Sequence, residues 1–581
     1  MLDNSYDTYK RWFDEKNMPD YLKRELATIA TDSEEIKERF HSHLTFGTGG
    51  MRGILGAGIN RMNIFTIRRV AEGLSRYLAT HCENASKRSV VIAYDTRHLS
   101  KEFALEAARV IGTHGFRVYL FNENRPTPEL SFAVRYLEAS AGIVITASHN
   151  PSNYNGIKVY GDDGGQLASK EAQEVLSYIE DIQDIFGIAL ETAENLMEEG
   201  LLIPVLEEID TAYQHKVLTL RRNESHSKST MKELPIVYTP LHGTGLVPVT
   251  TALKAFGFSN VTVVAEQALP NPDFSTVHYP NPEEPDTFKL AMELGVKTKA
   301  ELLLATDPDA DRLGVAARKG DRTFEIIGGN ELGALLLHYL LLTKEQAGTL
   351  PTNGVILKTI VTSELGRRIA AKFNVQTIDT LTGFKFISEK IKEYEATGEY
   401  TFLFGYEESY GYLLGDFVRD KDAVQAAVVT AEMAAYHLEN GKTLFDVLDD
   451  LYKEFGYHAE ATHALTFEGI AGQEKIERIM DIFRLNPPTE FGGVRVVAVE
   501  DYEQHQRIYS DGRIELLNLH QSNVLKFLLE DDSWICVRPS GTEPKCKFYL
   551  GVKKETSEEA ARMLEIMWAG IMDYLNTKGV N

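Results

Sequence analysis

The sequence contains few cysteines and no long apolar run, and each scarcity excludes a class of protein. Its 581 residues include 3 cysteines, Cys82, Cys536 and Cys546, which are too few for a disulfide scaffold and lack zinc-ligand spacing. The most apolar stretches, such as the one that starts at Leu332, are far shorter than the ~20 residues that cross a bilayer. The first residues carry charges throughout, unlike a signal peptide. These features predict a cytoplasmic protein with no membrane partner.

Basic residues are outnumbered as well. The 61 lysines and arginines stand against 85 aspartates and glutamates, and the net charge is −24. Such an excess of negative charge disfavours a nucleic-acid or anionic-membrane footprint, so we expect neither partner. A single pocket can still be positive, because net charge does not describe local charge. The apolar share of 43% and the charged share of 25% are those of a globular protein and exclude collagen-like or broadly disordered chains.

What the sequence does contain is an alternation of short β-branched runs with helical stretches. Apolar runs end in turn residues within segments 89–98, 141–151, 233–245, 301–312 and 354–363. Alternation of this kind is typical of parallel sheets that are covered by helices on both faces. In such sheets ligands bind at the carboxyl ends of the strands, which is where the polar motifs of this chain fall.

The ends of the chain differ from its middle. Residues 1–45 predict a charged amphipathic helix that braces the first domain. From about residue 456 the pattern becomes rich in strands, which is typical of a smaller α+β domain. Comparable strand–turn–helix units recur at Tyr94, Tyr238 and Lys358, a spacing that is compatible with three α/β domains of one general design.

Three aspartates alternate in the segment DPDADR, directly after an apolar strand. Asp307, Asp309 and Asp311 would repel one another unless a cation neutralised them, and their hard oxygen atoms suit Mg²⁺. A calcium EF-hand loop is excluded, because Arg312 replaces its required glycine and Arg318 its bidentate glutamate. An acidic turn on the solvated surface is the other interpretation. The position just past a buried strand favours the metal site.

Ser148 follows another apolar strand, in the segment TASHNP. A serine in this context often caps a turn. The glycine pattern of a hydrolase elbow is missing, and Ser148 and His149 do not form a dyad merely by adjacency, because neighbouring side chains in an extended segment point apart. A polar turn with Lys158 lies downstream, and taken alone this lysine is more often a surface residue.

Three further loops have the composition of ligand-binding turns. Residues 538–545, RPSGTEPK, combine two hydroxyls, a glycine and a cation at each end, as a phosphate monoester requires, with an exposed basic turn as the alternative. Residues 46–53, FGTGGMRG, form a glycine-rich turn beside Arg52. Residues 405–411, GYEESYG, place two acids and a serine between glycines, a set that could hydrogen-bond a polyol.

Taken together, the five loops resemble those of the phosphoglucomutase/phosphomannomutase superfamily, the α-D-phosphohexomutases. They occur in the family's order, and the forms GTGGMRG and NGIKVYGDDGG are most similar to the branch that holds bacillus-type phosphoglucomutase. The resemblance implies an α/β fold of four domains around a central cleft, three related domains with mixed or parallel sheets and a smaller C-terminal α+β domain. The predicted domains are 1–205 with the phosphoserine loop, 206–322 with the metal loop, 323–458 with the sugar-binding loop and 459–581 with the phosphate-binding loop.

The resemblance also implies roles for individual residues. The ligands of Mg²⁺ would be phosphorylated Ser148, Asp307, Asp309 and Asp311. Ser148 would be the phosphoserine of the resting enzyme, and Arg52, His149 and Lys158 would flank the transferred phosphoryl group and assist proton transfer. The residues that bind the substrate would be Arg312, Glu407, Ser409, Arg538, Ser540, Gly541, Thr542 and Lys545.

The activity implied by the resemblance is the interconversion of glucose 1-phosphate and glucose 6-phosphate. It would use a phosphoserine enzyme, with glucose 1,6-bisphosphate as activator and intermediate. Gly411 stands where phosphomannomutase-type members carry a histidine, which favours glucose over mannose. Phosphopentomutase and phosphomannomutase are the nearest alternatives, and a phosphoserine-type sugar phosphatase or a non-catalytic sensor would be a different class. Small sugar phosphates are the expected partners, and both a monomer and a homodimer stay open.

Overall fold

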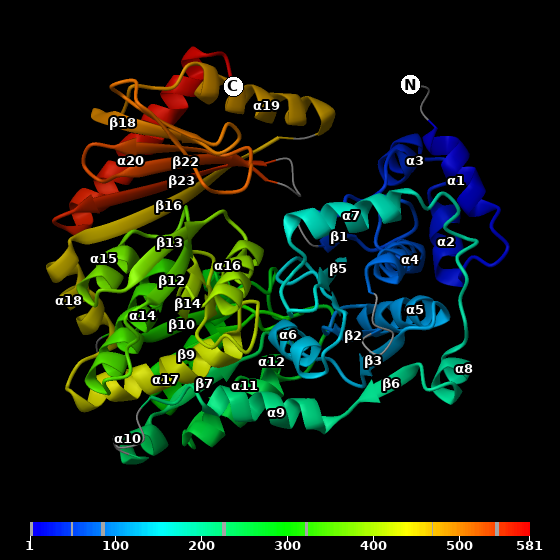
Figure 1. Ribbon diagram of the computed structural model, residues 1–581, viewed down its shortest axis with the longest axis horizontal. Helices are drawn as coiled ribbons and strands as arrows, with labels where there is room; N and C mark the ends of the chain where they lie inside the picture. Colours follow the sequence, from blue (N-terminus) through cyan, green and yellow to red (C-terminus); the bar gives the residue numbers. More distant parts are fainter. Residues whose placement is uncertain are drawn as a thin grey trace. The chain divides into compact units, whose positions relative to one another are not determined.

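The computed structural model describes residues 4–47, 50–82, 88–222, 228–319, 323–467, 469–540 and 545–580. These residues build four β-sheets with helices packed on them (Figure 1). Tertiary contacts group them into two compact units. The first unit comprises Met1–Leu332, Phe384–Gly405 and Ser409–Gly441, and the second comprises Gly333–Gly383, Tyr406–Glu408 and Lys442–Asn581.

The first sheet has six strands in the order β1-β5-β4-β2-β3-β6. Its strands are β1 (Gly50–Ile54), β2 (Ser89–Tyr94), β3 (Arg117–Phe121), β4 (Ala141–Ile145), β5 (Tyr154–Tyr160) and β6 (Leu202–Val205). Strands β4, β2, β3 and β6 run parallel, whereas β5 and β1 join antiparallel. Every position of β2 and β4 is buried, as their unbroken apolar runs predict for strands covered on both faces.

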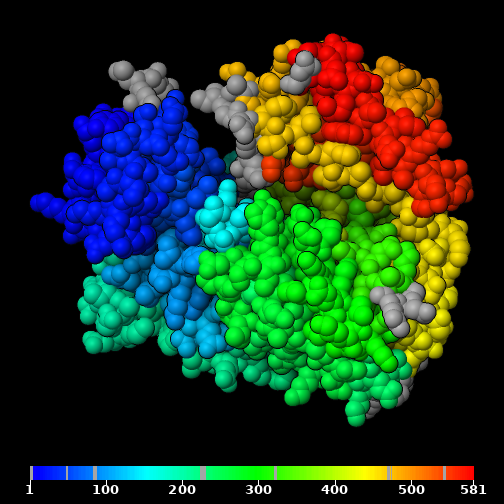
Figure 2. Space-filling view, turned by 180° about the vertical axis from the view of Figure 1, so that it is seen from behind, coloured from blue at the N-terminus to red at the C-terminus, as the bar shows by residue number. Residues whose placement is uncertain are grey.

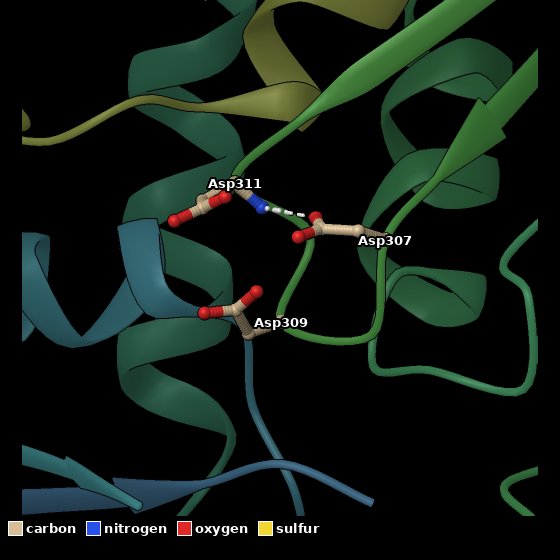
Figure 3. A group of neighbouring side chains, drawn as sticks. All are labelled: Asp307, Asp309 and Asp311. Atoms are coloured by element: carbon tan, nitrogen blue, oxygen red, sulfur yellow. Dashed lines mark hydrogen bonds between the residues drawn. The ribbon is translucent and has the colours of Figure 1, made fainter. Parts of the chain in front are cut away.

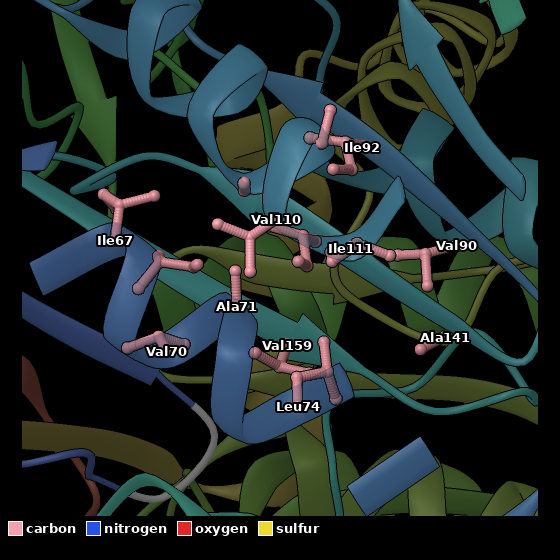
Figure 4. Packing of buried hydrophobic residues seen from close by; sticks show 14 of the residues in the cluster. Ile67, Val70, Ala71, Leu74, Val90, Ile92, Val110, Ile111, Ala141 and Val159 are labelled. Atoms are coloured by element: carbon pink, nitrogen blue, oxygen red, sulfur yellow. The ribbon is translucent and has the colours of Figure 1, made fainter. Parts of the chain in front are cut away.

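Helices cover this sheet and form the core of the first unit. They are α4 (Ile64–His81), α5 (Ser100–Thr113), α6 (Thr127–Tyr136), α7 (Ser169–Glu180) and α8 (Ala193–Glu198). The spacing of Ile67, Val70 and Leu74 places them on one face of α4, and all three are fully buried in the same cluster as Val90 and Val159 of the sheet (Figure 4). This packing holds in place the sheet from which the loop with Ser148 extends.

The N-terminal residues differ from the prediction. In place of one amphipathic helix over residues 1–45, the chain forms α1 (Ser5–Phe13), α2 (Asp20–Thr28) and α3 (Ser33–Phe40). Helix α1 ends at Phe13, and Pro19 stands immediately before α2, where its missing amide hydrogen prevents one helix from running through both segments. Asp32 accepts hydrogen bonds from two amides at the start of α3 and so begins a new helix. Local stop and start signals therefore outweigh the longer apolar periodicity.

The three short helices still pack against the first domain, as the sequence predicts. Trp12, Leu22 and Phe40 are almost completely buried in a cluster that also contains Phe65 of α4. In the space-filling view these helices are dark blue and rest on the lighter blue residues of the first sheet's helices (Figure 2). Their apolar faces are thus removed from water by contact with this domain.

The second sheet, also in the first unit, is mixed and has the order β11-β10-β9-β7-β8. Its strands are β7 (Ile236–Thr239), β8 (Val261–Val263), β9 (Leu302–Thr306), β10 (Leu313–Lys319) and β11 (Thr323–Ile327). Its helices are α9 (Glu207–Leu218), α10 (Lys228–Glu233), α11 (Leu246–Phe256), α12 (Ala265–Ala268), the short 3₁₀ helix η2 (Pro285–Phe288) and α13 (Lys289–Thr298). The central strand β9 is buried at every position, so the loop that follows it starts from the interior of the sheet.

The third sheet has the order β13-β12-β14-β15. Its strands are β12 (Gly354–Thr359), β13 (Gln376–Thr380), β14 (Thr401–Glu407) and β15 (Gly411–Leu413). The helices of this part of the chain are α14 (Gly329–Gln346), α15 (Leu365–Lys372), α16 (Phe384–Thr397), α17 (Ala423–Glu439) and α18 (Leu444–Phe455). Strands β12 and β13 pair in parallel, and α17 is apolar and buried along most of its length, as expected for a helix inside a large domain.

The C-terminal part contains an antiparallel sheet in the order β16-β23-β22-β21-β18-β19-β20, with β17 beside β18. Its strands are β16 (Tyr457–Thr466), β17 (Glu490–Phe491), β18 (Val494–Asp501), β19 (Gln506–Tyr509), β20 (Ile514–Leu516), β21 (Leu525–Leu529), β22 (Trp534–Pro539) and β23 (Lys545–Lys554). Helices α19 (Gly469–Leu485) and α20 (Ser557–Thr577) pack against it and complete its core.

The sheets confirm the predicted fold class, with mixed α/β sheets followed by a strand-rich α+β part. Within the described ranges, every helix is too short or too polar to cross a bilayer. The four predicted domain boundaries and the central cleft stay predictions.

Candidate active site and metal centre

Ser148 lies in the turn that follows β4. Its φ angle is +52°, in the left-handed region that is unfavourable for residues other than glycine. Its amide donates a hydrogen bond to Thr146 Oγ1 at 2.8 Å, and the residue is only 1% exposed. The serine therefore does not simply cap a surface turn, because its hydroxyl is buried in a strained segment that the surrounding structure must hold.

Arg97 holds this turn. Its guanidinium donates to the backbone carbonyls of Ser148 and Pro151, each at 2.7 Å, and of Tyr154 at 3.1 Å. Asp95 pairs with the Arg97 Nε atom at 3.3 Å, and both side chains are fully buried. The sequence analysis missed this pair, although both residues stand at the end of the predicted strand 89–98.

The three aspartates of the loop after β9 converge on one point (Figure 3). Each offers an oxygen within 4.8 Å of the others, and all three residues are at most 1% exposed. Asp307 Oδ1 accepts hydrogen bonds from the amides of Asp311 at 3.1 Å and Arg312 at 3.0 Å, which fix the loop. The alternative of an acidic turn on the surface is therefore wrong.

The serine and the aspartates meet. Ser148 Oγ donates a hydrogen bond to Asp307 Oδ2 at 3.1 Å and lies 3.2 Å from the Nδ1 atom of His149. The two loops are separated by 159 residues in sequence and follow central strands of two different sheets. A hydroxyl and three carboxylates therefore share one site inside the first unit.

Lys158 completes this group from the neighbouring strand β5. Its Nζ atom donates to Asp309 Oδ2 at 2.8 Å and lies 3.2 Å from Asp311 Oδ2, and the residue is 5% exposed. Burial favours the neutral amine, but the two carboxylates outweigh it and raise the pKa of Lys158. The interpretation of Lys158 as an ordinary surface residue is wrong.

Two other groups on the aspartates were missed from the sequence. The Lys421 Nζ atom lies 3.2 Å from Asp311 Oδ2, and Thr127 Oγ1 donates to Asp309 Oδ2 at 2.9 Å. Lys421 stands between two acids just before α17. Acids at this place are also explained by the start of the helix, which favours negative charge. Only the alternating charges of that segment could have marked it.

The residues present fit a divalent cation. The Oδ1 atoms of Asp309 and Asp311 are buried and accept no hydrogen bond from the residues that the structure describes. Burial and the two neighbouring carboxylates raise the pKa of Asp307 well above its ordinary value, which reflects the repulsion within the triplet. Carboxylate oxygens are the ligands that Mg²⁺ prefers. The cluster therefore could hold Mg²⁺, with the two lysines compensating part of its negative charge.

Two arginines flank this group in the first unit. Arg52, exposed on β1, donates from Nη1 to Asn150 Oδ1 at 3.3 Å. Arg312 Nη1 pairs with Glu283 Oε1 at 2.5 Å, and its backbone forms a bridge with Gly411. The end of the segment GYEESYG is thereby joined to the metal loop. Ser409 lies just before this junction and is half-buried.

The remaining predicted residues lie in the second unit. Glu407 ends β14 and accepts a hydrogen bond from the amide of Gly383 at 3.0 Å, while Glu408, the other acid of the segment GYEESYG, accepts from Thr359 Oγ1 at 3.2 Å. The residues at the ends of strands β22 and β23 are Arg538, Ser540 and Lys545, and the amide of Ser540 donates to the Lys545 carbonyl at 2.7 Å. Gly541 and Thr542 lie outside the described residues. The roles of these six residues stay predictions.

Comparison with known protein families accounts for most of the chain. Models of the phosphoglucomutase/phosphomannomutase α/β/α domains I, II and III match residues 43–185, 211–320 and 328–455, and the model of the C-terminal domain matches 494–567. The chain belongs to the phosphoglucomutase/phosphomannomutase family. The resemblance that was inferred from the five loops is confirmed.

Curated relatives in this family match nearly the full length. A phosphoglucomutase from Staphylococcus haemolyticus is 41% identical over 527 residues, 90% of this chain and 93% of the relative. A phosphoglucomutase from Staphylococcus aureus strain N315 is 40% identical over 557 residues, 96% and 97% of the two chains. The crystal structure of a putative phosphomannomutase from Thermus thermophilus is 22% identical, covers 90% of this chain and 98% of its own, and has a TM-score of 0.66. At that identity it supports the fold alone.

Proposed function

We propose that this protein is a phosphoglucomutase that interconverts glucose 1-phosphate and glucose 6-phosphate. Relatives that are 40–41% identical over 90–96% of the chain carry that name. The observation that carries the proposal is the hydrogen bond of 3.1 Å from Ser148 Oγ to Asp307 Oδ2, because it places a phosphorylatable hydroxyl against a site that fits Mg²⁺. Glucose 1,6-bisphosphate is the proposed activator and intermediate.

Each half-reaction moves one phosphoryl group. The bond from phosphorus to Ser148 Oγ breaks, a sugar hydroxyl forms a new bond to phosphorus, and the hydroxyl proton passes to a base, for which we propose His149, because the raised pKa of Lys158 keeps that side chain charged. The resulting bisphosphate turns over and returns its other phosphoryl group to Ser148. Because such transfers pass through a loose transition state, the protein contributes mainly position and charge.

The first-unit residues supply that position and charge. The Arg97 hydrogen bonds to the Ser148 turn hold the serine oxygen at the aspartates, and the three aspartates would bind Mg²⁺. When bound, Mg²⁺ supplies positive charge that stabilises the serine oxygen as it leaves phosphorus. Lys158, buried against two of the aspartates, and Arg52 would bring cations to the transferred phosphoryl group.

The remaining residues would select the sugar phosphate. Arg312, Glu407 and Ser409 are proposed to contact the sugar, and the residues proposed to bind the non-reacting phosphate are Arg538, Ser540, Gly541, Thr542 and Lys545. A dianion held at the far end of the substrate would orient the reacting hydroxyl. We further propose that the protein acts in the cytoplasm on free sugar phosphates as a monomer or homodimer.

The proposal is tested by the phosphorylation state and the activity of one matched pair of proteins. Wild-type protein incubated with glucose 1,6-bisphosphate should gain one phosphoryl group in intact mass and should convert glucose 1-phosphate, whereas Ser148→Ala should do neither. Kinetics with glucose, mannose and ribose 1-phosphates should give the highest kcat/KM for glucose. Phosphate release that exceeds isomerisation would instead identify a phosphatase, and a fully active Ser148→Ala variant would refute the mechanism.

The metal centre has a separate test. Asp309→Asn should raise the Mg²⁺ concentration for half-maximal activity by roughly 100-fold, since it removes a charged ligand from a compact site. The control is Asp450→Asn on the exposed face of α18, where the carboxylate is 45% exposed. Equal Mg²⁺ dependence in both variants would count against the assignment of the aspartates.

A further inference from the structure

A buried arginine of α4 has no ion-pair partner among the residues that the structure describes. Arg69 is 8% exposed, and its Nε atom is buried without a hydrogen bond. No carboxylate of the described residues lies within ion-pair distance of it, and Glu180 acts on Arg69 only through its field. A guanidinium is always charged and has five N–H donors. Buried charges of this kind are ordinarily paired, so a counter-charge close to Arg69 would stabilise it.

The same arginine lines a small cavity behind β1. Most of the wall is apolar, with Trp12 of α1, Met51 of β1 and Ile179 of α7 among the lining residues. His43 is a further polar residue of this wall. The space inside admits about one water-sized sphere. The cavity is therefore too small for a sugar phosphate, and it is separate from the aspartates that could hold Mg²⁺.

His43 adds a second donor of hydrogen bonds. Its ring lines the same cavity as Arg69, and burial together with the nearby Arg69 charge lowers the pKa of His43 to about 4. At neutral pH the imidazole is therefore uncharged and offers one ring N–H. A charged guanidinium and a neutral N–H in a space that is otherwise apolar apart from Thr66 match a small monovalent anion. A water molecule would satisfy donors but would leave the buried charge uncompensated.

We propose that Arg69 and His43 form a binding site for a small monovalent anion of the size of a halide, between the N-terminal helices and the first sheet. The bound anion neutralises Arg69 and joins α1, α4 and β1 around one ion. Met51 lines this cavity, and the next residue in β1 is Arg52, which reaches Asn150 beside Ser148. Occupancy therefore stabilises the strand that carries a residue of the proposed active site.

The test measures the thermal stability of the full-length protein as one anion is exchanged for another. Chloride, bromide or acetate replaces a bulky sulfonate at constant ionic strength and pH 7.5. Ligand that binds only the folded state raises stability with its concentration, so each tenfold increase in halide above its Kd should raise the Tm of a chain of this size by about 1 °C. Acetate is the size control and should give no such rise, because it is larger than the space in the cavity.

Two variants separate this site from general salt effects. Arg69→Met keeps the length of the side chain but removes its charge, and should lose the anion response. Arg76→Met, on the same helix, alters an arginine that is 47% exposed and paired with Glu72, and should keep it. An equal anion response in Arg69→Met and wild type would overturn the proposal.

A direct measurement covers the case in which Arg69→Met does not fold. Crystals of the wild-type protein soaked in bromide should show an anomalous scattering peak in the cavity beside Arg69 and His43. A cavity without such a peak, in crystals that bind bromide at other positions, would contradict the proposal. The proposed phosphoglucomutase activity is independent of this result, because its test uses Ser148.

Discussion

Ser148 illustrates how one residue depends on others that are distant in sequence. A serine at φ +52° has a conformation that costs roughly 1–3 kcal/mol, and the free energy that holds it there comes from its surroundings. Arg97 donates to the Ser148 and Pro151 carbonyls, and Asp95 holds Arg97 in turn. The position of the Ser148 hydroxyl is therefore a property of this network.

Arg97→Lys should weaken catalysis without a comparable loss of substrate binding. The lysine keeps a charge next to Asp95. It has one ammonium group in place of the planar guanidinium, so it cannot donate to the same set of carbonyls. Because small displacements of a reacting group are costly, kcat should fall by roughly 100-fold while KM changes little. Steady-state kinetics and the rate of Ser148 phosphorylation measure both effects.

Arg109→Lys is the matched control for that experiment. Arg109 lies on α5 and bonds to the Glu191 carbonyl and Glu106, away from the Ser148 turn. This variant should keep the wild-type kcat. If Arg97→Lys also keeps it, the Arg97 network does not position the serine.

Helix α4 shows how tightly two elements meet in the first unit. A Cβ atom built on Gly73 would lie 2.4 Å from Ile179 Cγ1 of α7 and 2.9 Å from its backbone nitrogen. The two helices therefore approach as closely as they do only because position 73 has no side chain. The sequence gives no sign of this contact, since an isolated glycine in a helical pattern has several explanations.

Gly73→Ala should destabilise the protein, although alanine is the better helix former. Overpacking against backbone atoms costs roughly 1–3 kcal/mol, which exceeds the ~1 kcal/mol gain in helix propensity. Gly570→Ala in α20 is the counterpart, because its nearest contact would be an ordinary 3.5 Å, and it should be neutral or stabilising. Calorimetry of both variants decides the matter, and a stable Gly73→Ala would show that α4 and α7 can separate.

Contacts between helices of different sheets join the first unit into one body. Asp422 at the start of α17 is fully buried and accepts hydrogen bonds from the Tyr213 hydroxyl of α9 at 2.8 and 2.9 Å. Burial raises the pKa of Asp422 to about 6, and burial, with a smaller contribution from the Asp422 charge, raises the pKa of Glu129 on α6. The neighbouring side chain Lys421 is directed to Asp311 instead.

This buried acid should make stability depend on pH. Since the folded-state pKa of Asp422 is about 6 and its ordinary value is 3.8, the folded state binds the proton more tightly. The contribution of Asp422 is fully present below about pH 4 and is lost as the pH rises through 6, by about 3 kcal/mol. Asp422→Asn, which can still cap α17, should lose less stability between pH 4.5 and 7.5. Identical pH profiles in chemical denaturation would contradict the assignment.

Substrate capture should also depend on residues far from Ser148 in the chain. The protein carries a net charge of −24, so a sugar phosphate dianion must be bound by local cations against the overall field. Arg538→Ala should raise KM for glucose 1-phosphate by roughly 10-fold or more, as expected for the loss of a charged hydrogen bond. Arg495→Ala, at an exposed arginine paired with Glu530, is the control, and an unchanged KM in Arg538→Ala would remove this residue from the phosphate site.

The sequence by itself determined the α/β alternation, the metal loop and the position of Ser148 after a buried strand. These features are local: apolar period, turn residues and closely spaced carboxylates act over a few neighbouring residues. The one local prediction of an element that was wrong, a single helix over residues 1–45, neglected the break at Pro19 and the cap at Asp32.

Only the tertiary structure decided which side chains surround those loops. Lys158 and Lys421 are both directed to Asp311, although they are far from it and from each other in sequence. Their ammonium groups are placed there because whole sheets and helices pack to bury apolar surface, and that packing brings together residues separated by more than a hundred positions. No local pattern records such a meeting, so a lysine that looks exposed in the sequence can be a buried partner of an aspartate cluster.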